Sequence, residues 1–374
     1  MSPASLAAAG ARLVLEDGTV LEGSAYGARG TAAGELVFIT SMSGYQEIVT
    51  DPSFAGQMIV FTQPMIGNYG VEGDVSESTG PQARAVIVRE GRNAAPAGRI
   101  GFCDWLESHD VVGIQGLDTR MLTRRLRDGG TVRAAVSSDG STVPELLEAI
   151  ASEPDMAGRA LAGTVSQAKV SALPALAEEL AHVALIDYGV KSSIVRILRE
   201  SGARVTIFPW NASATDILEC GADGVLLANG PGDPAALPAC VAEVRELIGN
   251  APVFGICLGH QLLGLALGLE TFKLRFGHRG ANHPVLDVDT GRVLVTAQNH
   301  GFAVRVPEGG DLDTDFGPAR VTHVSLYDGT VEGLALRDLP VSSMQFHPEA
   351  SPGPHDARVA LERFVASLAG SPVA

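Results

Sequence analysis

The chain has 374 residues, a length that suggests two or three domains. Hydrophobic residues make up 45% and charged residues 19%, which is ordinary for an enzyme with a large core. The formal net charge is −16, and an acidic surface of this kind repels phosphate groups. Composition therefore argues against nucleic acids and anionic membranes as partners.

The cysteines and the N-terminus indicate the compartment. Four cysteines are widely spread and form no C-x-x-C pair, so neither a zinc site nor a redox motif is expected, and Cys220 and Cys240 are interpreted as inert thiols. No apolar run reaches transmembrane length. Residues 1–10 lack the basic start and apolar core of a signal peptide and are expected to form a disordered tail. We therefore expect a cytoplasmic protein.

Residues 11–150 are predicted to form a β-rich α/β first domain. Strands at 12–15 and 19–22 flank Glu16-Asp17-Gly18, which is a hairpin signal. Further strands are expected at 36–40, 58–62 and 85–88, and a short amphipathic helix at 144–150. The segment 41–53 is rich in turn residues and is expected to be a long polar loop.

A helix at 118–126 carries the one basic cluster of this acidic chain. The cluster consists of Arg120, Arg124, Arg125 and Arg127. A run of charge is commonly a solvated helix face, and a docking surface is the alternative. Residues 151–181 follow the first domain without a clear strand and are expected to be a linker.

From residue 182 to the end, the pattern predicts a doubly wound, mostly parallel α/β sheet. Four strand–helix units follow one another, and such units place helices on both faces of a parallel sheet. Their strands are expected at 182–189, 204–209, 224–228 and 251–256, and their helices at 191–201, 215–220, 235–249 and 261–269. Shorter strands follow at 292–297, 321–327, 331–336 and 341–346, and a helix at 356–368 closes the chain.

A sharp turn between a strand and a helix is predicted at Gly255-Ile-Cys-Leu-Gly259. Glycines two residues on either side of Cys257 give the spacing of a nucleophile elbow, with Cys in place of Ser. Such a turn holds its middle residue at a strained backbone conformation and exposes the sulfur at a helix N-terminus, where an anion is stabilised. A buried structural cysteine is the alternative for any single Cys. The strand, glycines and helix together favour a nucleophile.

A cysteine nucleophile needs a base, and the base needs an orienting acceptor. His347 ends the last predicted strand, and Glu349, two residues on, points to the same side. His260 is a second candidate base by proximity alone. The N–H of Leu258 and the loop Gly230-Pro-Gly232 could form an oxyanion hole. No Lys-Ser/Thr follows that loop, so it is not a phosphate-binding P-loop.

Three motifs occur in order along the second half: Asn-Gly-Pro-Gly-Asp-Pro (229–234), Gly-Ile-Cys-Leu-Gly-His-Gln (255–261) and Gln-Phe-His-Pro-Glu (345–349). Together they resemble the class I, triad-type glutamine amidotransferases. The first domain is similar to that of the small subunits of carbamoyl-phosphate synthase at 15–19, 40–53, 66–68 and 117–120. The resemblance covers nearly all of the chain except residues 1–10 and 163–181.

The resemblance implies roles for individual residues. Cys257 would attack the carboxamide of glutamine, His347 would relay protons and Glu349 would orient the histidine. The substrate-binding residues it implies are Ser53 from the first domain, Gly230, Gly232, Leu258 and Gln261 around the oxyanion, and Asn299, Gly301 and Phe302 at the α-amino and α-carboxylate end.

The resemblance also implies a partner. Ammonia would pass through an internal channel to a large subunit, in a heterodimer or a higher oligomer of heterodimers. That subunit would use ATP, Mg²⁺ and bicarbonate to make carbamoyl phosphate for arginine and pyrimidine synthesis, so no metal or cofactor is expected in this chain. Three alternatives stay open: another amidotransferase subunit, a free-standing γ-glutamyl hydrolase, and a non-enzymatic regulatory or scaffolding subunit.

Overall fold

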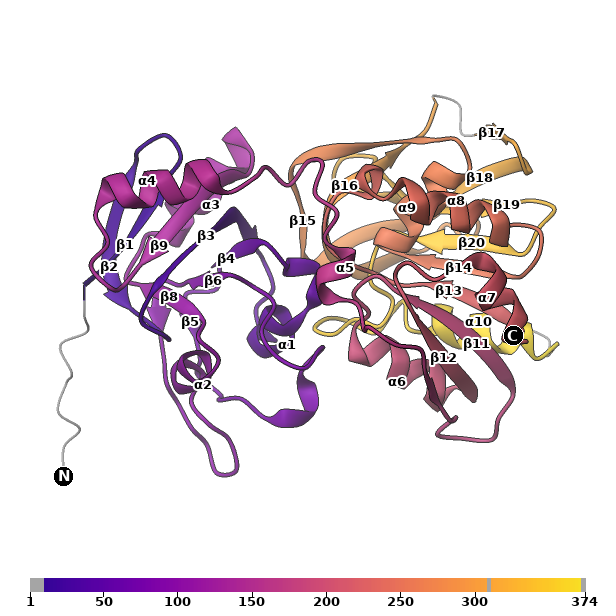
Figure 1. Cartoon of the computed structure of the whole chain (residues 1–374), viewed down its shortest axis with the longest axis horizontal. Coiled ribbons are helices and arrows are strands. Elements are labelled where there is room, and N and C mark those ends of the chain that lie inside the picture. The colour runs from indigo at the N-terminus through magenta and orange to yellow at the C-terminus, as the bar shows by residue number, and fades with distance from the viewer. Residues whose placement is uncertain (1–9, 308–310, 371–374) are drawn as a thin grey trace. The chain divides into compact units, whose positions relative to one another are not determined.

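The computed structural model describes residues 10–307 and 311–370, and its contacts divide the chain into two compact units (Figure 1). The first unit ends at Met156 and the second begins at Ala157. Residues 1–9 of the expected disordered tail lie outside the described residues, and Gly10 already begins a strand. No helix among the described residues combines the length and apolar character needed to cross a membrane.

The first unit is a closed barrel with the strand order β1-β2-β8-β6-β4-β3-β9. The strands are β1 (Gly10–Leu15), β2 (Val20–Ala25), β3 (Thr31–Ile39), β4 (Gln57–Phe61), β6 (Ala85–Ile87), β8 (Val112–Gln115) and β9 (Val132–Ser137). The pairs β3–β4, β4–β6 and β6–β8 are parallel. The predicted hairpin is confirmed, with Val14 opposite Val20. Outside the barrel, β5 (Met65–Ile66) pairs with β7 (Glu90–Gly91).

Helices cover the barrel where apolar strand residues face outward. The predicted helices are confirmed as α3 (Thr119–Gly129) and α4 (Val143–Ser152). Leu146 and Ile150 of α4 pack on Val14 and Ala135. Helix α2 (Phe102–Ser108), β8 and β9 were not predicted from the sequence.

The prediction of a polar loop at 41–53 is wrong, because this segment contains helix α1 (Tyr45–Thr50) and the 3₁₀ turn η1 (Pro52–Phe54). Its polar groups are buried by bonding to neighbouring backbone. Tyr45 donates its hydroxyl to the Gly70 carbonyl at 2.7 Å, and the Gln46 side chain bonds both backbone groups of Glu72. A segment that looks solvated in sequence is therefore part of the packed structure.

The second unit is an 11-stranded sheet, and the predicted doubly wound arrangement is confirmed. Its central order β12-β11-β13-β14-β20 is parallel, and β19-β18-β15-β16 continue it in antiparallel fashion. The strands are β10 (Ser171–Leu173), β11 (Ala181–Asp187), β12 (Ala203–Pro209), β13 (Gly224–Leu227), β14 (Val253–Ile256), β15 (Glu270–Asp287), β16 (Val293–Arg305), β17 (Asp311–Thr314), β18 (Gly317–Ser325), β19 (Val331–Leu336) and β20 (Val341–Met344). The 18-residue β15 was not predicted.

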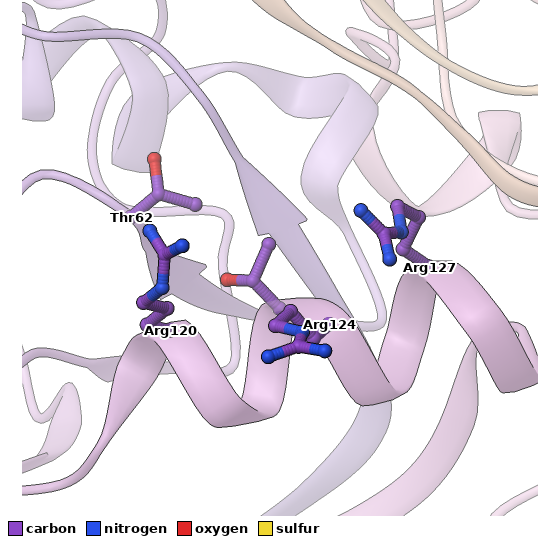
Figure 2. Close-up of a pocket in the computed structure, with 5 residues that line it drawn as sticks. Thr62, Arg120, Arg124 and Arg127 are labelled. Carbon is purple, nitrogen blue, oxygen red and sulfur yellow. The ribbon is translucent and has the colours of Figure 1, made fainter.

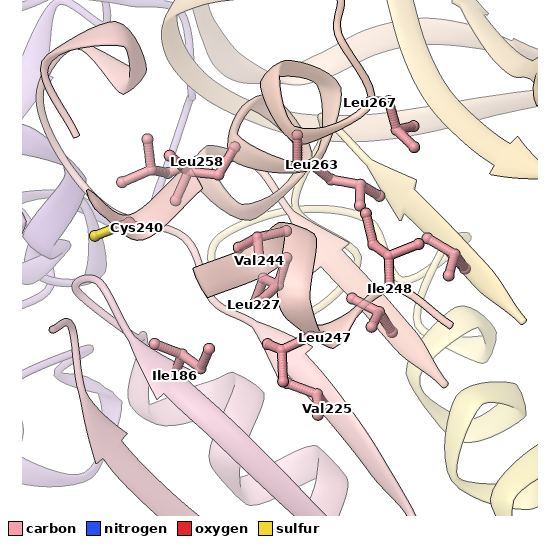
Figure 3. Close-up of a cluster of buried hydrophobic side chains, with 14 of the residues drawn as sticks. Ile186, Val225, Leu227, Cys240, Val244, Leu247, Ile248, Leu258, Leu263 and Leu267 are labelled. Carbon is pink, nitrogen blue, oxygen red and sulfur yellow. The ribbon is translucent and has the colours of Figure 1, made fainter. Parts of the chain in front are cut away.

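Alternate residues of the central strands pack against two sets of helices. One face packs against α7 (Ala214–Glu219), α8 (Pro238–Leu247) and α9 (Leu258–Ala266), and the other against α6 (Ser192–Glu200) and α10 (Val359–Leu368). Figure 3 shows the first cluster, where strand residues such as Val225 and Leu227 meet Val244 and Leu247 of α8 and Leu263 of α9. Each such side chain contributes about 1.5–3 kcal/mol on burial. This core fixes α9 against the end of β14.

The segment 151–181, expected to be a linker, contains regular structure. Helix α4 ends at Ser152, α5 spans Ala162–Val165, and β10 pairs antiparallel with the sheet strand β12. The Gly158 N–H donates to Asp233 at 2.8 Å. From residue 157 on, this segment is therefore built into the second unit.

Candidate active site

Cys257 occupies the turn between β14 and α9 in a strained conformation, with φ 53° and ψ −103°. The flanking glycines make the turn possible. A Cβ on Gly259 would lie 2.2 Å from the Leu227 carbonyl oxygen, and one on Gly255 would lie 2.8 Å from the Gly259 backbone. Side chains at either position would push the helix off the strand. The sulfur is thus held at the N-terminus of α9 and is 2% exposed.

His347 and Glu349 follow β20, the strand that pairs parallel with β14. The N–H at Nδ1 of His347 donates to Oε1 of Glu349 at 2.7 Å, and both side chains are buried. The His347 backbone N–H bonds to Ala297 of β16, which fixes the segment beyond the strand. The other ring nitrogen, Nε2, makes no full hydrogen bond within the described residues, which leaves it available for proton transfer.

The charges around His347 favour its protonated form. Burial opposes a charge on the ring, but the charges of Glu349 and Cys257 and the proximity of both side chains outweigh it and raise the pKa of His347 to about 10. Cys257 is therefore close enough to act on His347, although the pair lacks the geometry of a full hydrogen bond. Such pairs are often loose before substrate binds.

Lys191 also belongs to this site, although the sequence motifs did not predict it. It is 3% exposed, and its ammonium lies 2.8 Å from Oε1 of Glu349 and donates to the Ser351 carbonyl. Burial would raise the pKa of Glu349, but the charges of Lys191 and His347 hold it well below its usual range. A signal existed, because Lys191 follows the carboxyl end of β11, where ligands of parallel sheets bind.

The glycine loop approaches Cys257 from the end of β13. A Cβ on Gly230 would lie 2.2 Å from the Tyr188 carbonyl oxygen and 2.9 Å from the Leu258 side chain, so this residue lies against the start of α9. A Cβ on Gly232, which has φ +97°, would lie 2.5 Å from the Arg159 carbonyl oxygen. The loop therefore lies beside Leu258, whose N–H is the other donor considered for an oxyanion hole.

The segment 299–302 lies within β16, beyond the strand end predicted at 297. The Cys257 sulfur contacts the Asn299 carbonyl at 3.7 Å, and Gln261 donates to the Phe302 carbonyl at 2.8 Å. Gln261 also donates to Gln345, just beyond β20. Asn299, Phe302 and the elbow helix are thereby joined, and Gly301 lies between them in sequence.

Two further residues considered from sequence, His260 and Ser53, have local partners of their own. His260 is fully buried and bonds Ser343 through Nδ1 at 2.8 Å; burial, and then the charge of His323, lower its pKa to about 3. His260 is therefore a neutral histidine of the core. Its closeness to Cys257 in the sequence, which made it a candidate base, does not make it part of the site. Ser53 belongs to the first unit, where it is buried within η1 and its N–H bonds the Asp51 side chain.

A second buried polar cluster lies in the antiparallel half of the sheet. Ligand atoms of His278, His300 and Glu332 lie within 4.8 Å of one another, close enough to hold a metal ion. His278 also donates to Asp328 at 2.8 Å. Burial would lower the pKa of His278, but the two carboxyl groups raise it to about 9. His278 therefore lies between two carboxyl groups, those of Asp328 and Glu332.

Comparison with known proteins covers both units. Residues 184–367 match the family model described as "Glutamine amidotransferase class-I", and residues 13–136 match "Carbamoyl-phosphate synthase small chain, CPSase domain". The carbamoyl phosphate synthase small chains of Akkermansia muciniphila and Xanthomonas campestris are 44% and 46% identical to this chain; each alignment covers 96% of this chain and 97% of the relative. The small chain of Listeria monocytogenes is 45% identical, with 96% of both chains covered.

These identities extend over almost the whole length of each protein, first domain included, and agree with the geometry at Cys257. The chain belongs to the carbamoyl phosphate synthase small chain family.

Proposed function

We propose that this chain hydrolyses L-glutamine at Cys257 and supplies the ammonia to a large synthetase chain that makes carbamoyl phosphate. One observation carries the proposal: a strained cysteine at a helix N-terminus lies beside a buried His347–Glu349 pair. The match of residues 13–136 to the small-chain domain supports this partner over that of another amidotransferase or a free-standing hydrolase.

The first half-reaction forms a thioester. The thiolate of Cys257 adds to the carboxamide carbon of glutamine, and the carbonyl oxygen becomes an oxyanion. The Leu258 N–H and the Gly230–Gly232 loop would stabilise this charge, and a single such donor is typically worth about 3–4 kcal/mol. His347, protonated at neutral pH, gives its proton to the departing nitrogen. The carbon–nitrogen bond breaks, and ammonia leaves a glutamyl thioester on Cys257.

The second half-reaction restores the enzyme. His347, now neutral, removes a proton from water, and the resulting hydroxide adds to the thioester carbon. The carbon–sulfur bond breaks, glutamate leaves, and the thiolate and imidazolium pair is restored. Glu349 keeps Nδ1 of His347 protonated and the ring oriented in both steps, because it accepts the hydrogen bond from that nitrogen.

The remaining roles extend this proposal. Asn299, Gly301 and Phe302 would hold the α-amino and α-carboxylate groups, with Gln261 supporting them, and Ser53 would contact glutamine from the first unit. ATP, Mg²⁺ and bicarbonate would be used by the large chain alone, in a heterodimer or an oligomer of heterodimers. We place the complex in the cytoplasm, where the four cysteines, which form no disulfide, would stay reduced.

The test is glutamate release by the purified chain, alone and with the large chain, ATP and bicarbonate, with Cys257→Ala as the blank. We expect slow release alone, strong stimulation in the complete mixture and none from the variant. Acid quenching during turnover should trap a glutamyl adduct on the wild type, seen as added mass on the peptide that contains Cys257. Full activity alone, unaffected by the large chain, would contradict the coupled function.

A further inference from the structure

The outer face of helix α3 carries an open pocket lined by arginines. Its volume is about 480 Å³, and its lining residues are Thr62, Arg120, Thr123, Arg124 and Arg127. Figure 2 shows Arg120, Arg124 and Arg127 along successive turns of the helix, with Thr62 facing Arg120. Thr62 follows the carboxyl end of β4, so the pocket lies between the helix and that end of the strand.

The sequence of α3 separates an inner from an outer face. Leu122 and Leu126 are completely buried, and the Asp118 side chain caps the helix by accepting the Met121 N–H at 2.9 Å. Arg125, which the sequence grouped with the other arginines, instead bonds Asp17 and Thr19 of the β1–β2 hairpin. The basic surface is therefore narrower than expected: Arg120, Arg124 and Arg127, hereafter the arginine face.

The positive charge of the arginine face is largely uncompensated within the chain. Across residues 10–307 and 311–370, Arg120 and Arg124 form no ion pair or side-chain hydrogen bond, and Arg127 pairs with its exposed neighbour Asp128. Like charges four residues apart on a helix repel each other. Arg125 and Arg133 of the same unit, by contrast, have carboxylate partners. A solvated face alone would not need these charges to converge on one pocket.

We propose that the arginine face docks an acidic segment of the large synthetase chain, an inference that rests on the proposed function. Guanidinium groups bind carboxylates through two parallel hydrogen bonds. Arg120 and Arg127 are seven residues apart, about 10 Å along the helix, which fits several carboxylates of one segment better than a single small anion. Since the rest of this acidic chain repels an acidic partner, the face would fix the orientation of docking.

The test compares two charge-reversal variants of the full chain for binding to the purified large chain. Arg120→Glu with Arg124→Glu reverses two of the three charges of the arginine face. Arg29→Glu with Arg84→Glu changes the net charge equally, at exposed arginines that lie just before β3 and β6, away from the carboxyl end where Thr62 lies. We expect the first variant to bind at least about tenfold more weakly than the control, and the gap to narrow with added salt.

The outcomes separate this inference from the proposed function. Equal thermal midpoints and equal glutamate release by the isolated variants would show that both are folded and that Cys257 is unaffected. Wild type that does not bind the large chain would overturn the proposed partner and the docking together. Wild type and Arg120→Glu/Arg124→Glu with equal affinity would overturn the docking alone. The docking would also be overturned if inorganic phosphate stabilised the wild type but not Arg120→Glu/Arg124→Glu while both bound the large chain equally well. The arginine face would then be an anion site.

Discussion

Lys191 connects the buried His347–Glu349 pair to the segment that follows β11. Its ammonium, the Glu349 carboxylate and the His347 ring form one buried line of alternating charge from β11 to the segment after β20. A buried ion pair is retained at a desolvation cost, and removing one partner leaves the other charge uncompensated. The two cationic neighbours, Lys191 and His347, therefore keep Glu349 ionised and hold it in place.

Lys191→Met should destabilise the protein by about 3–5 kcal/mol, because Glu349 would stay buried with one cationic partner fewer. Urea unfolding measures the change. The double variant Lys191→Met/Glu349→Gln should lose less than Lys191→Met alone, since the buried carboxylate is gone and His347 can become neutral by losing its proton. If Lys191→Met unfolded at the wild-type urea concentration, the ion pair would have no role in stability.

The raised pKa of His347 gives a pH dependence with a definite sign. Its folded-state pKa of about 10 lies above the ordinary value of 6.5, so the protonated ring stabilises the folded state. That contribution is fully present below pH 6.5 and is lost as pH rises through about 10. Denaturant unfolding of wild type and His347→Gln between pH 6.5 and 10 measures it.

The stability difference between these two proteins should shrink steadily over that range. Glu362→Gln on the exposed side of α10 is the matched control, because its partner Arg358 stays charged throughout. A difference that stays constant with pH would mean that the folded protein holds His347 neutral.

At the scale of elements, the elbow is the part of the fold where strain and function coincide. Cys257 has a positive φ, which residues other than glycine rarely adopt. The packing of β14 and α9 around Gly255 and Gly259 holds it in this conformation. Residues held in such conformations cost about 1–3 kcal/mol each. This cost accompanies the placement of the sulfur at the helix N-terminus.

Cys257→Gly should therefore be more stable than Cys257→Ala, by about 1–3 kcal/mol. At an ordinary helix or strand position the order is reversed, because glycine costs about 0.5–1 kcal/mol relative to alanine. Both variants lack the sulfur and should release no glutamate, so only unfolding midpoints distinguish them. An alanine variant as stable as the glycine variant would show that the elbow is relaxed.

The elements that sequence predicted correctly are those with a local cause. The alternation of strands and helices predicted the elements from β11 through α9, and the spacing of the glycines predicted the elbow. Helix α1 and Lys191 were missed because their burial depends on partners far along the chain, such as Gly70 and Glu349. The arginine cluster was predicted as a unit, but Arg125 was wrongly included, because the hairpin that binds it lies 108 residues away.

At the scale of the whole molecule, the boundary between the units determines what the second unit needs to fold. From sequence we expected the second domain to begin at 182, after a linker, whereas the contacts place residues from 157 in the second unit. Asp187 accepts the Gln167 N–H at 2.7 Å, and β10 covers β12 as an edge strand. Gly232 of the glycine loop packs on the Arg159 carbonyl. The segment thus supports both the sheet and the candidate oxyanion hole.

A fragment of residues 157–374 should therefore melt cooperatively and at a higher temperature than a fragment of residues 182–374. The shorter fragment loses donors to Asp187 and Asp233 and uncovers the β12 edge, which also favours aggregation. These two lost hydrogen bonds cost about 2 kcal/mol together, or about 4–8 °C in melting midpoint for a domain of this size. Thermal melts followed by circular dichroism measure the gap. Equal midpoints would mean that the second unit begins at residue 182 and that the segment 157–181 is a linker.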